Sequence, residues 1–221
     1  MSAARDAVAT AAREVSLVIR GALHDDGGTI LLLGPDEPGF WAVFSASGEY
    51  GDGGPDPLDR WSKRVIRAIA APLGGRAVFP SDGPPYPPFL DWAQAAGNAW
   101  PSPVGPLVHD TAGLLISYRG AIVLPGEETL TDARPPSPCP ACPRPCATAC
   151  PVGAMRAGQV YDVATCQSFL RTEEGRVCRT RGCRVRHACP ASAAMRRTDQ
   201  QAAFHMSAFM GSWPPPQGGT A

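Results

Sequence analysis

The sequence lacks any long apolar run, and no stretch approaches the roughly 18 residues that a membrane-spanning helix needs. It also lacks net charge, because 20 basic and 20 acidic side chains cancel; this argues against a chain that binds a polyanion along its whole length. The N-terminal segment contains Asp6 and Glu14 and has no central apolar block, so it does not resemble a secretory signal. With 44% hydrophobic residues, disorder throughout is not expected. We therefore expect a folded, cytoplasmic protein without a membrane segment.

Cysteine is absent from the first 138 residues, and all eight cysteines lie between Cys139 and Cys189. Eight cysteines can form four disulfides or two sites of four thiolates each. Disulfides seldom persist in the reducing compartment expected for a chain without an export signal. The distribution therefore favours metal binding.

The cysteine spacing indicates which metal centre to expect. The first run is Cys139-Pro-Ala-Cys142-Pro-Arg-Pro-Cys146-Ala-Thr-Ala-Cys150-Pro151. In bacterial two-cluster ferredoxins, three closely spaced thiolates hold one 4Fe–4S cubane, and a fourth that precedes a proline ligates the other cluster. The usual run has two residues between the second and third cysteines. Here there are three, so the loop must bulge by one residue.

The later cysteines also end on a Cys-Pro pair, Cys189-Pro190. Two such endings favour an arrangement in which each run of cysteines gives its last thiolate to the other run's cluster. We assign one 4Fe–4S cluster to Cys139, Cys142, Cys146 and Cys189, and the other to Cys150, Cys166, Cys178 and Cys183. A pair of structural zinc sites is the alternative, since zinc also takes four thiolates. Zinc ribbons, however, usually present two separated Cys-x-x-Cys pairs, and this chain has one.

Residues 171–197 carry eight arginines against Glu173 and Glu174. Such cations favour the reduced, more negative state of a nearby cluster. The same surface could attract an acidic redox partner or a phosphate backbone, or it could be a solvated face with no specific role. Nucleic-acid binding is the weaker reading, because no aromatic residue interrupts the stretch from 176 to 197.

The residues before the cysteines alternate between helical and strand patterns. A helix beginning at an Asp56 cap and Pro57 should place Leu58, Trp61, Val65 and Ile69 on one apolar stripe. Thr198 and Gln201 offer a capping box for a last helix. The other expected helices are 3–14, 38–46, 88–96 and 199–210, and the expected strands are 17–19, 30–33, 77–79, 104–109, 114–118 and 121–124.

These elements predict an α+β fold, with a sheet-and-helix domain over 1–133 and a cysteine module over 134–195. Residues 196–221 should form a C-terminal helix and a loose tail. The glycine-rich loop 48–54 lacks both the Gly-x-Gly-x-x-Gly pattern and a Walker lysine, so we interpret it as turn chemistry.

The order of the cysteines resembles the cluster module of epoxyqueuosine reductases and of cobalamin-dependent reductive dehalogenases. The matching features are the run ending in Cys150-Pro151, Cys166 before Gln-Ser-Phe-Leu, and the last three cysteines ending in Cys189-Pro190. This resemblance implies two 4Fe–4S clusters in a bacterial-ferredoxin-like module. It also implies a corrinoid such as cobalamin, held in a nitroreductase-like domain.

Residues 105–126 are similar to a stretch of the CblC-type cobalamin-processing proteins, from His109 and Gly113 to the ending Arg119-Gly-Ala-Ile-Val-Leu-Pro-Gly. The resemblance associates Arg119 with a ligand site, and His109 and Tyr118 are further candidates for cofactor binding. His109 is followed by aspartate where those proteins have proline. No residue matches the catalytic aspartate or tyrosine of the reductases, so catalytic residues stay unassigned.

Three functions remain open. The chain could be a reductase that passes electrons through two clusters to a corrinoid or a similar bulky cofactor in residues 1–133. It could be a ferredoxin-type carrier that serves a redox partner and performs no small-molecule chemistry. It could also be a cofactor chaperone that binds cobalamin without turnover.

Overall fold

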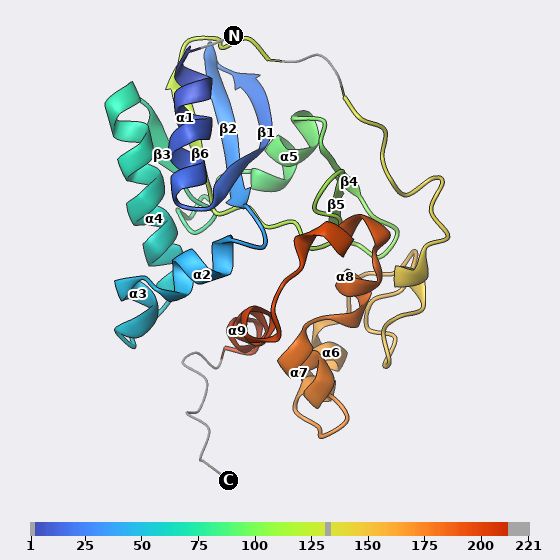
Figure 1. The fold of residues 1–221 in the computed structure, drawn as a ribbon. Helices are drawn as coiled ribbons and strands as arrows, with labels where there is room; N and C mark the ends of the chain where they lie inside the picture. Colours follow the sequence, from blue (N-terminus) through green and yellow to red (C-terminus); the bar gives the residue numbers. More distant parts are fainter. Residues whose placement is uncertain (1–2, 131–133, 212–221) are drawn as a thin grey trace. The chain divides into compact units, whose positions relative to one another are not determined.

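The computed structural model describes residues 3–130 and 134–211, which form two compact units (Figure 1). The first, here called the sheet unit, comprises Met1–Trp100 and Ile116–Pro136. The second, here called the cysteine unit, comprises Pro101–Leu115 and the chain from Ser137 onward, and contains all eight cysteines. The chain combines α-helices with an antiparallel sheet, so the expected α+β class is confirmed.

The sheet unit is built on four antiparallel strands in the order β1-β2-β6-β3. Asp26 and Gly27 join β1 to β2 with φ values of 46° and 74°, the positive pair that a two-residue hairpin turn of type I′ requires. The central strand β2 is buried along its whole length. The strands are β1 (Leu17–Asp25), β2 (Gly28–Pro35), β6 (Gly120–Pro125) and β3 (Arg76–Val78).

The described residues of this unit form five α-helices. In Figure 1, α1 and α4 lie side by side over the sheet, where α1 packs on β1 and α4 packs on β3 and β6. The helices are α1 (Ala3–Glu14), α2 (Phe40–Ser45), α3 (Gly48–Gly51), α4 (Pro57–Ala70) and α5 (Phe89–Ala95), and a 3-10 turn η1 (Ala71–Leu73) follows α4.

The predicted stripe of α4 is buried, as expected, and forms the core with α2. Trp61 is 2% exposed, and its ring centroid lies 5.6 Å from that of Phe40 and 5.8 Å from that of Phe44. The expected Asp56 cap is wrong. Asp56 has a left-handed backbone, with φ of 47°, and its side chain makes no capping hydrogen bond, because a capping residue needs an extended backbone to reach the first turn.

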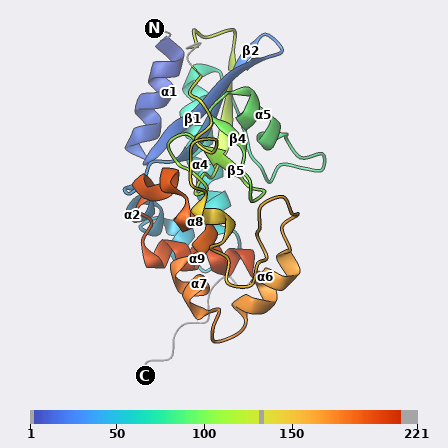
Figure 2. The same cartoon turned by 90° about the vertical axis from the view of Figure 1, so that its right-hand side faces the viewer.

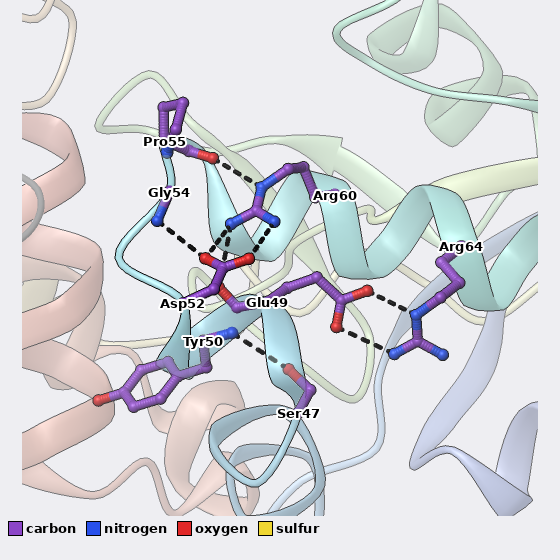
Figure 3. A network of polar contacts seen from close by, with 8 residues as sticks. All are labelled: Ser47, Glu49, Tyr50, Asp52, Gly54, Pro55, Arg60 and Arg64. Atoms are coloured by element: carbon purple, nitrogen blue, oxygen red, sulfur yellow. Dashed lines mark hydrogen bonds and ion pairs between the residues drawn. The ribbon is translucent and has the colours of Figure 1, made fainter.

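The glycine-rich loop before α4 is held by ion pairs (Figure 3). Asp52 accepts two hydrogen bonds of 2.7 Å from Arg60, and its Oδ1 also accepts the Gly54 N–H at 2.8 Å. Glu49 of α3 pairs with Arg64 through two nitrogens. The hydrogen bond from Arg64 lowers the pKa of Glu49 to about 2, and that from Arg60 lowers the pKa of Asp52 to about 2. These contacts therefore fix the loop to α4 and give it a structural role.

The cysteine unit is mainly helical over residues 137–211, with α7 packed against α9 and α6 (Figure 2). Thr198 accepts the Gln201 N–H at 3.1 Å, so the predicted cap of the last helix is confirmed. The elements are β5 (Leu107–His109), η2 (Pro145–Ala147), α6 (Val163–Leu170), α7 (Arg176–Arg181), α8 (Arg184–Ala188), η3 (Pro190–Met195) and α9 (Asp199–Phe209). The short strand β4 (Ala99–Pro101) lies at the chain boundary, with only Pro101 in this unit.

Residues 101–115 belong to the cysteine unit, whereas the sequence placed them in the first domain. Gly113 turns the chain with φ of 55° and lies against η3, where a Cβ would stand 2.4 Å from the Ser192 nitrogen. Arg197 also donates a hydrogen bond of 2.5 Å to the Leu115 carbonyl. The predicted strand 114–118 is wrong, because this turn leaves only a bridge between His109 and Gly113.

Within residues 3–130 and 134–211, no helix is long and apolar enough to cross a membrane. The proline-rich tail predicted near residue 213 lies outside the described residues.

Candidate metal centre

Four cysteines line a cavity of about 170 Å³ in the cysteine unit, here called the first cysteine cavity. Cys166 comes from α6, Cys178 from α7, and Cys183 directly precedes α8. Cys150 reaches the same cavity from the first cysteine run. None of these thiols forms a disulfide.

Local chain geometry explains how α6, α7 and α8 bring three of these cysteines together. The Asp162 side chain caps α6 by accepting the Thr165 N–H at 2.9 Å, which starts the helix just before Cys166. Gly182 ends α7 with φ of 88°, a left-handed backbone that favours glycine. The resulting turn lets Cys178 and Cys183 border one cavity although α7 and α8 are separate helices.

The rest of the first cysteine cavity is mostly apolar. The Tyr161 and Phe209 rings stack, with centroids 6.3 Å apart, and the Cys183 Sγ lies 4.0 Å from the Met155 Sδ. Three residues of α9, His205, Met206 and Phe209, line this cavity, so the last helix packs against the cysteines of this set. The lining residues other than cysteine are Pro106, Val152, Ala154, Met155, Tyr161, Phe169, Leu170, Arg186, His205, Met206 and Phe209.

The other four cysteines line a second cavity of about 210 Å³, here called the second cysteine cavity. They are Cys139, Cys142, Cys146 and Cys189. Residues of the 101–115 segment form part of its wall: Ser102, Val108 and Leu114. This segment is therefore part of the candidate site.

The expected one-residue bulge between Cys142 and Cys146 coincides with Arg144, which has a left-handed backbone with φ of 56°. In this conformation the Arg144 N–H donates a hydrogen bond of 3.3 Å to the Cys142 sulfur. Cys189 lies between α8 and η3, and Pro190 occupies the first position of the 3-10 turn, where a missing N–H costs nothing.

The thiols of each cavity interact electrostatically with one another. Burial raises the pKa of the Cys146 thiol, and the charges of Cys189, Cys139 and Cys142 raise it further. In the first cavity, burial likewise raises the pKa of Cys166, with further contributions from Cys183 and Cys150. Four mutually repelling thiolates in a buried site need a multivalent cation to balance them.

Basic groups oppose this repulsion at particular cysteines. Burial raises the pKa of Cys178, whereas the Arg184 backbone N–H and its side-chain charge lower it. Arg144 acts in the same direction on Cys139. These arginines therefore favour the thiolate form that a metal requires.

The structure groups the eight cysteines into the same two sets of four that the spacing predicts. Among the residues described, no group of three or more His, Cys, Asp or Glu side chains is arranged to hold a single metal ion. Each set of four thiols lines one cavity.

The three predicted cofactor residues do not share one unit. His109 belongs to the cysteine unit, is 3% exposed, and its Nδ1 lies 2.7 Å from the Asp110 Oδ1. The Thr111 and Ala112 N–H groups also point at His109 Nδ1, so this histidine organises its own turn.

Tyr118 and Arg119 belong to the sheet unit. The Arg119 side chain is 18% exposed, and its Nη1 lies 3.7 Å from the Asp59 Oδ1. The Arg119 Nε is buried and makes no hydrogen bond with any described residue. Burial lowers the pKa of Arg119, and Asp59 opposes this only in part. A hollow at the β1–β2 turn of the same unit contains neither Tyr118 nor Arg119.

Sequence reasoning missed Tyr161. Its ring borders the first cysteine cavity and stacks on Phe209, with the two centroids 6.3 Å apart. The available signal was its position, directly before the Asp162 cap and five residues before Cys166.

No protein-family model, curated protein or solved structure matches this chain. The resemblances drawn from the cysteine order and from residues 105–126 therefore stay predictions.

Proposed function

We propose that this chain is an iron–sulfur protein that transfers electrons through two 4Fe–4S clusters. The observation that carries the proposal is the pair of cavities in the cysteine unit, each lined by four free cysteines. Neither cavity has a carboxylate in its lining. A donor set made only of thiolates selects soft centres, and 4Fe–4S clusters are held by four of them.

The thiol arrangement supports a cluster over the zinc alternative. A single tetrahedral zinc ion with Zn–S bonds of about 2.3 Å holds its thiolates roughly 4 Å apart. No group of three His, Cys, Asp or Glu side chains in the described parts of the chain is suited to one ion. A cubane carries its four thiolates on different irons and therefore separates them more widely, which agrees with cysteines that surround a cavity.

The residues around the thiols have distinct roles in this proposal. When bound, each cluster would supply a one-electron carrier. The apolar lining of the first cysteine cavity excludes water, which tunes the potential of such a centre. Arg184 and Arg144 stabilise thiolates, and Arg186 adds a cation to the wall of the first cavity.

The finer structural expectations belong to this proposal. The cysteine order supports a ferredoxin-like role for the cysteine unit, and the antiparallel sheet with helices packed on it is compatible with a nitroreductase-like domain. Free thiols and oxygen-sensitive clusters suit the reducing cytoplasm. The cysteine unit has ten arginines against five acidic residues, so an acidic redox protein is the partner we propose as electron donor or acceptor.

A corrinoid acceptor remains a separate proposal, and the three residues fit it only in part. Arg119 has a nitrogen without a hydrogen-bond partner among the described residues, so it is suited to an acidic group of a ligand. The Nδ1 of His109 is engaged by its own turn, so only its other ring nitrogen could face such a ligand. We therefore derive no reaction step through a corrinoid.

Both proposals can be tested on anaerobically purified protein. Analysis of iron and acid-labile sulfide should give about eight of each per chain, and reduction should produce electron paramagnetic resonance (EPR) signals of two clusters. Zinc in place of iron after expression with both metals available would contradict the cluster proposal. Titration with hydroxocobalamin should give a saturable spectral change that Arg119→Gln weakens, and the absence of any change would leave an electron carrier.

A further inference from the structure

Helix α7 packs against α6 and α9 within the cysteine unit, and one of its sides faces solvent (Figure 1). Its opposite side carries Cys178, which is buried and lines the first cysteine cavity. The exposed residues share one face of the helix, because residues four positions apart lie one turn above each other. They are Arg176, Val177, Thr180 and Arg181, here called the α7 face.

The α7 face has an apolar residue between two arginines. Val177 is 48% exposed. Arg176 pairs with Glu173 at 2.7 Å, and Arg181 pairs with Asp199 at 3.3 Å. All four charged side chains are at least 61% exposed. Exposed ion pairs contribute little to stability, so carboxylates of a partner can compete for both arginines.

The segment around the α7 face is basic and held in place. Residues 171–186 contain six arginines and two acidic residues, a surplus of four positive charges. Arg179 donates hydrogen bonds to the carbonyls of Leu170 and Thr172, which fixes the turn between α6 and α7. The α7 face therefore presents positive charge on a preformed surface, which favours an acidic partner.

An acidic protein suits this surface better than the phosphate backbone of a nucleic acid. None of the four residues of the α7 face is aromatic, so it offers no ring on which a base could stack. An apolar centre with a charged rim, and arginine in particular, is typical of protein interfaces.

We propose that the α7 face is the docking surface for an acidic redox protein, which exchanges electrons with the cluster of the first cysteine cavity. This inference rests on the proposed function. Val177 is joined to Cys178 by one peptide bond, so a partner on the α7 face lies one residue from a candidate ligand of that cluster. Each exchange moves one electron between the cluster and the partner's redox centre, so that one is oxidised as the other is reduced.

The test uses cluster-loaded protein, reduced and freed of excess reductant, and acidic plastocyanin, a blue-copper protein, in its Cu(II) form. One electron passes from a reduced cluster to Cu(II), which becomes Cu(I), and stopped-flow loss of the blue colour gives the bimolecular rate constant. Arg176→Glu/Arg181→Glu should lower this rate constant about tenfold at low ionic strength. The difference should shrink as salt is added, because salt screens exposed charges. An unchanged rate constant in the loaded variant would overturn the inference.

The matched control is Arg13→Glu/Arg76→Glu, which makes the same change in net charge at two exposed arginines of the sheet unit. Its rate constant should stay within about twofold of the wild-type value, because steering depends on charge near the docking surface. An equal fall in both double variants would show that net charge, and not the α7 face, governs the encounter. That result would also overturn the inference.

Hydrogen–deuterium exchange of the loaded wild-type protein locates the surface without any substitution, and it decides if the α7 variant loses iron. Peptides from residues 171–186 should exchange more slowly when plastocyanin is present. No protection there would overturn the inference, and so would protection by a duplex oligonucleotide but not by plastocyanin. If wild-type protein binds no iron at all, the proposed function fails instead, so the two failures are distinguishable.

Discussion

Paired cysteine replacements test the division of the eight thiols between two cavities. In the structure, Cys146 shares the second cysteine cavity with Cys189, whereas Cys150 lines the first. A sequential division would instead group Cys139, Cys142, Cys146 and Cys150. Two double variants, Cys146→Ala/Cys189→Ala and Cys146→Ala/Cys150→Ala, therefore give opposite results under the two divisions.

The expected magnitudes follow from which cavity each variant disrupts. Each of the single variants Cys146→Ala, Cys150→Ala and Cys189→Ala removes one ligand of one set, so iron should fall from about eight to about four per chain. The Cys146/Cys189 double variant touches a single cavity and should keep about four irons. The Cys146/Cys150 double variant touches both cavities and should keep almost none.

The assay combines iron and sulfide analysis of anaerobically purified protein with EPR spectra of the reduced state. Circular dichroism of each variant checks that the helices remain, since loss of the fold would remove iron for another reason. Coupling of this kind between residues of one site is the usual cause of non-additive effects. The division we describe is refuted if the Cys146/Cys150 variant keeps about four irons and the Cys146/Cys189 variant keeps none.

Three further predictions concern the fold. Trp61→Ala should lower the free energy of unfolding of the sheet unit by about 3–5 kcal/mol in chemical denaturation, and a loss under 1 kcal/mol would contradict its place in the core. Because Arg64 lowers the pKa of Glu49 to about 2, its contribution is complete above the unfolded value of 4.5 and is lost as the pH falls toward 2. Glu49→Gln should therefore destabilise the protein at pH 7 and do so less at pH 3; an equal effect at both would exclude the ion pair as the cause. Gly113→Ala should lower the free energy of unfolding by about 1–3 kcal/mol and should cause loss of the second cluster before the first. Equal loss of both clusters would show that the turn does not serve one cavity.

Local patterns predicted much of the fold. The stripe of α4 and the capped start of α9 depend on residues within a few positions of each other, and both are found in the structure. Asp56 shows the limit of such patterns. Its residue type suits a helix cap, but its backbone conformation removes the side chain from that role, and residue type does not determine conformation.

The division of the cysteines could also be predicted, since two Cys-Pro endings and the inserted residue near Arg144 are features of spacing. The role of the segment 101–115 could not, because it depends on the approach of Gly113 to Ser192, about eighty positions along the chain. The contacts of His109 could not be predicted from its sequence context either: its Nδ1 is engaged by the next three residues, and its assignment to a cofactor stays a prediction.

The surplus of arginines in the cysteine unit is related to the candidate metal centre. The chain is neutral as a whole, yet the cysteine unit carries ten arginines against five acidic residues, and the sheet unit carries the opposite surplus. If the arginines only formed a solvated basic face, none of them would be expected to lie close to the thiols. Arg144 and Arg184, however, lower the pKa of Cys139 and Cys178, and Arg186 lines the first cysteine cavity.

Each oxidised cluster with four thiolates would bring about two negative charges into the unit, so two clusters would offset most of its surplus of five. The arginines would thus supply cations to the eight cysteines, of which Cys146, Cys178 and Cys189 are buried, and to the proposed clusters. The same calculation indicates how an acidic partner would sense loading, since a unit without clusters is far more basic than a loaded one. Attraction to such a partner should therefore weaken as the clusters are inserted, and its dependence on salt should weaken with it.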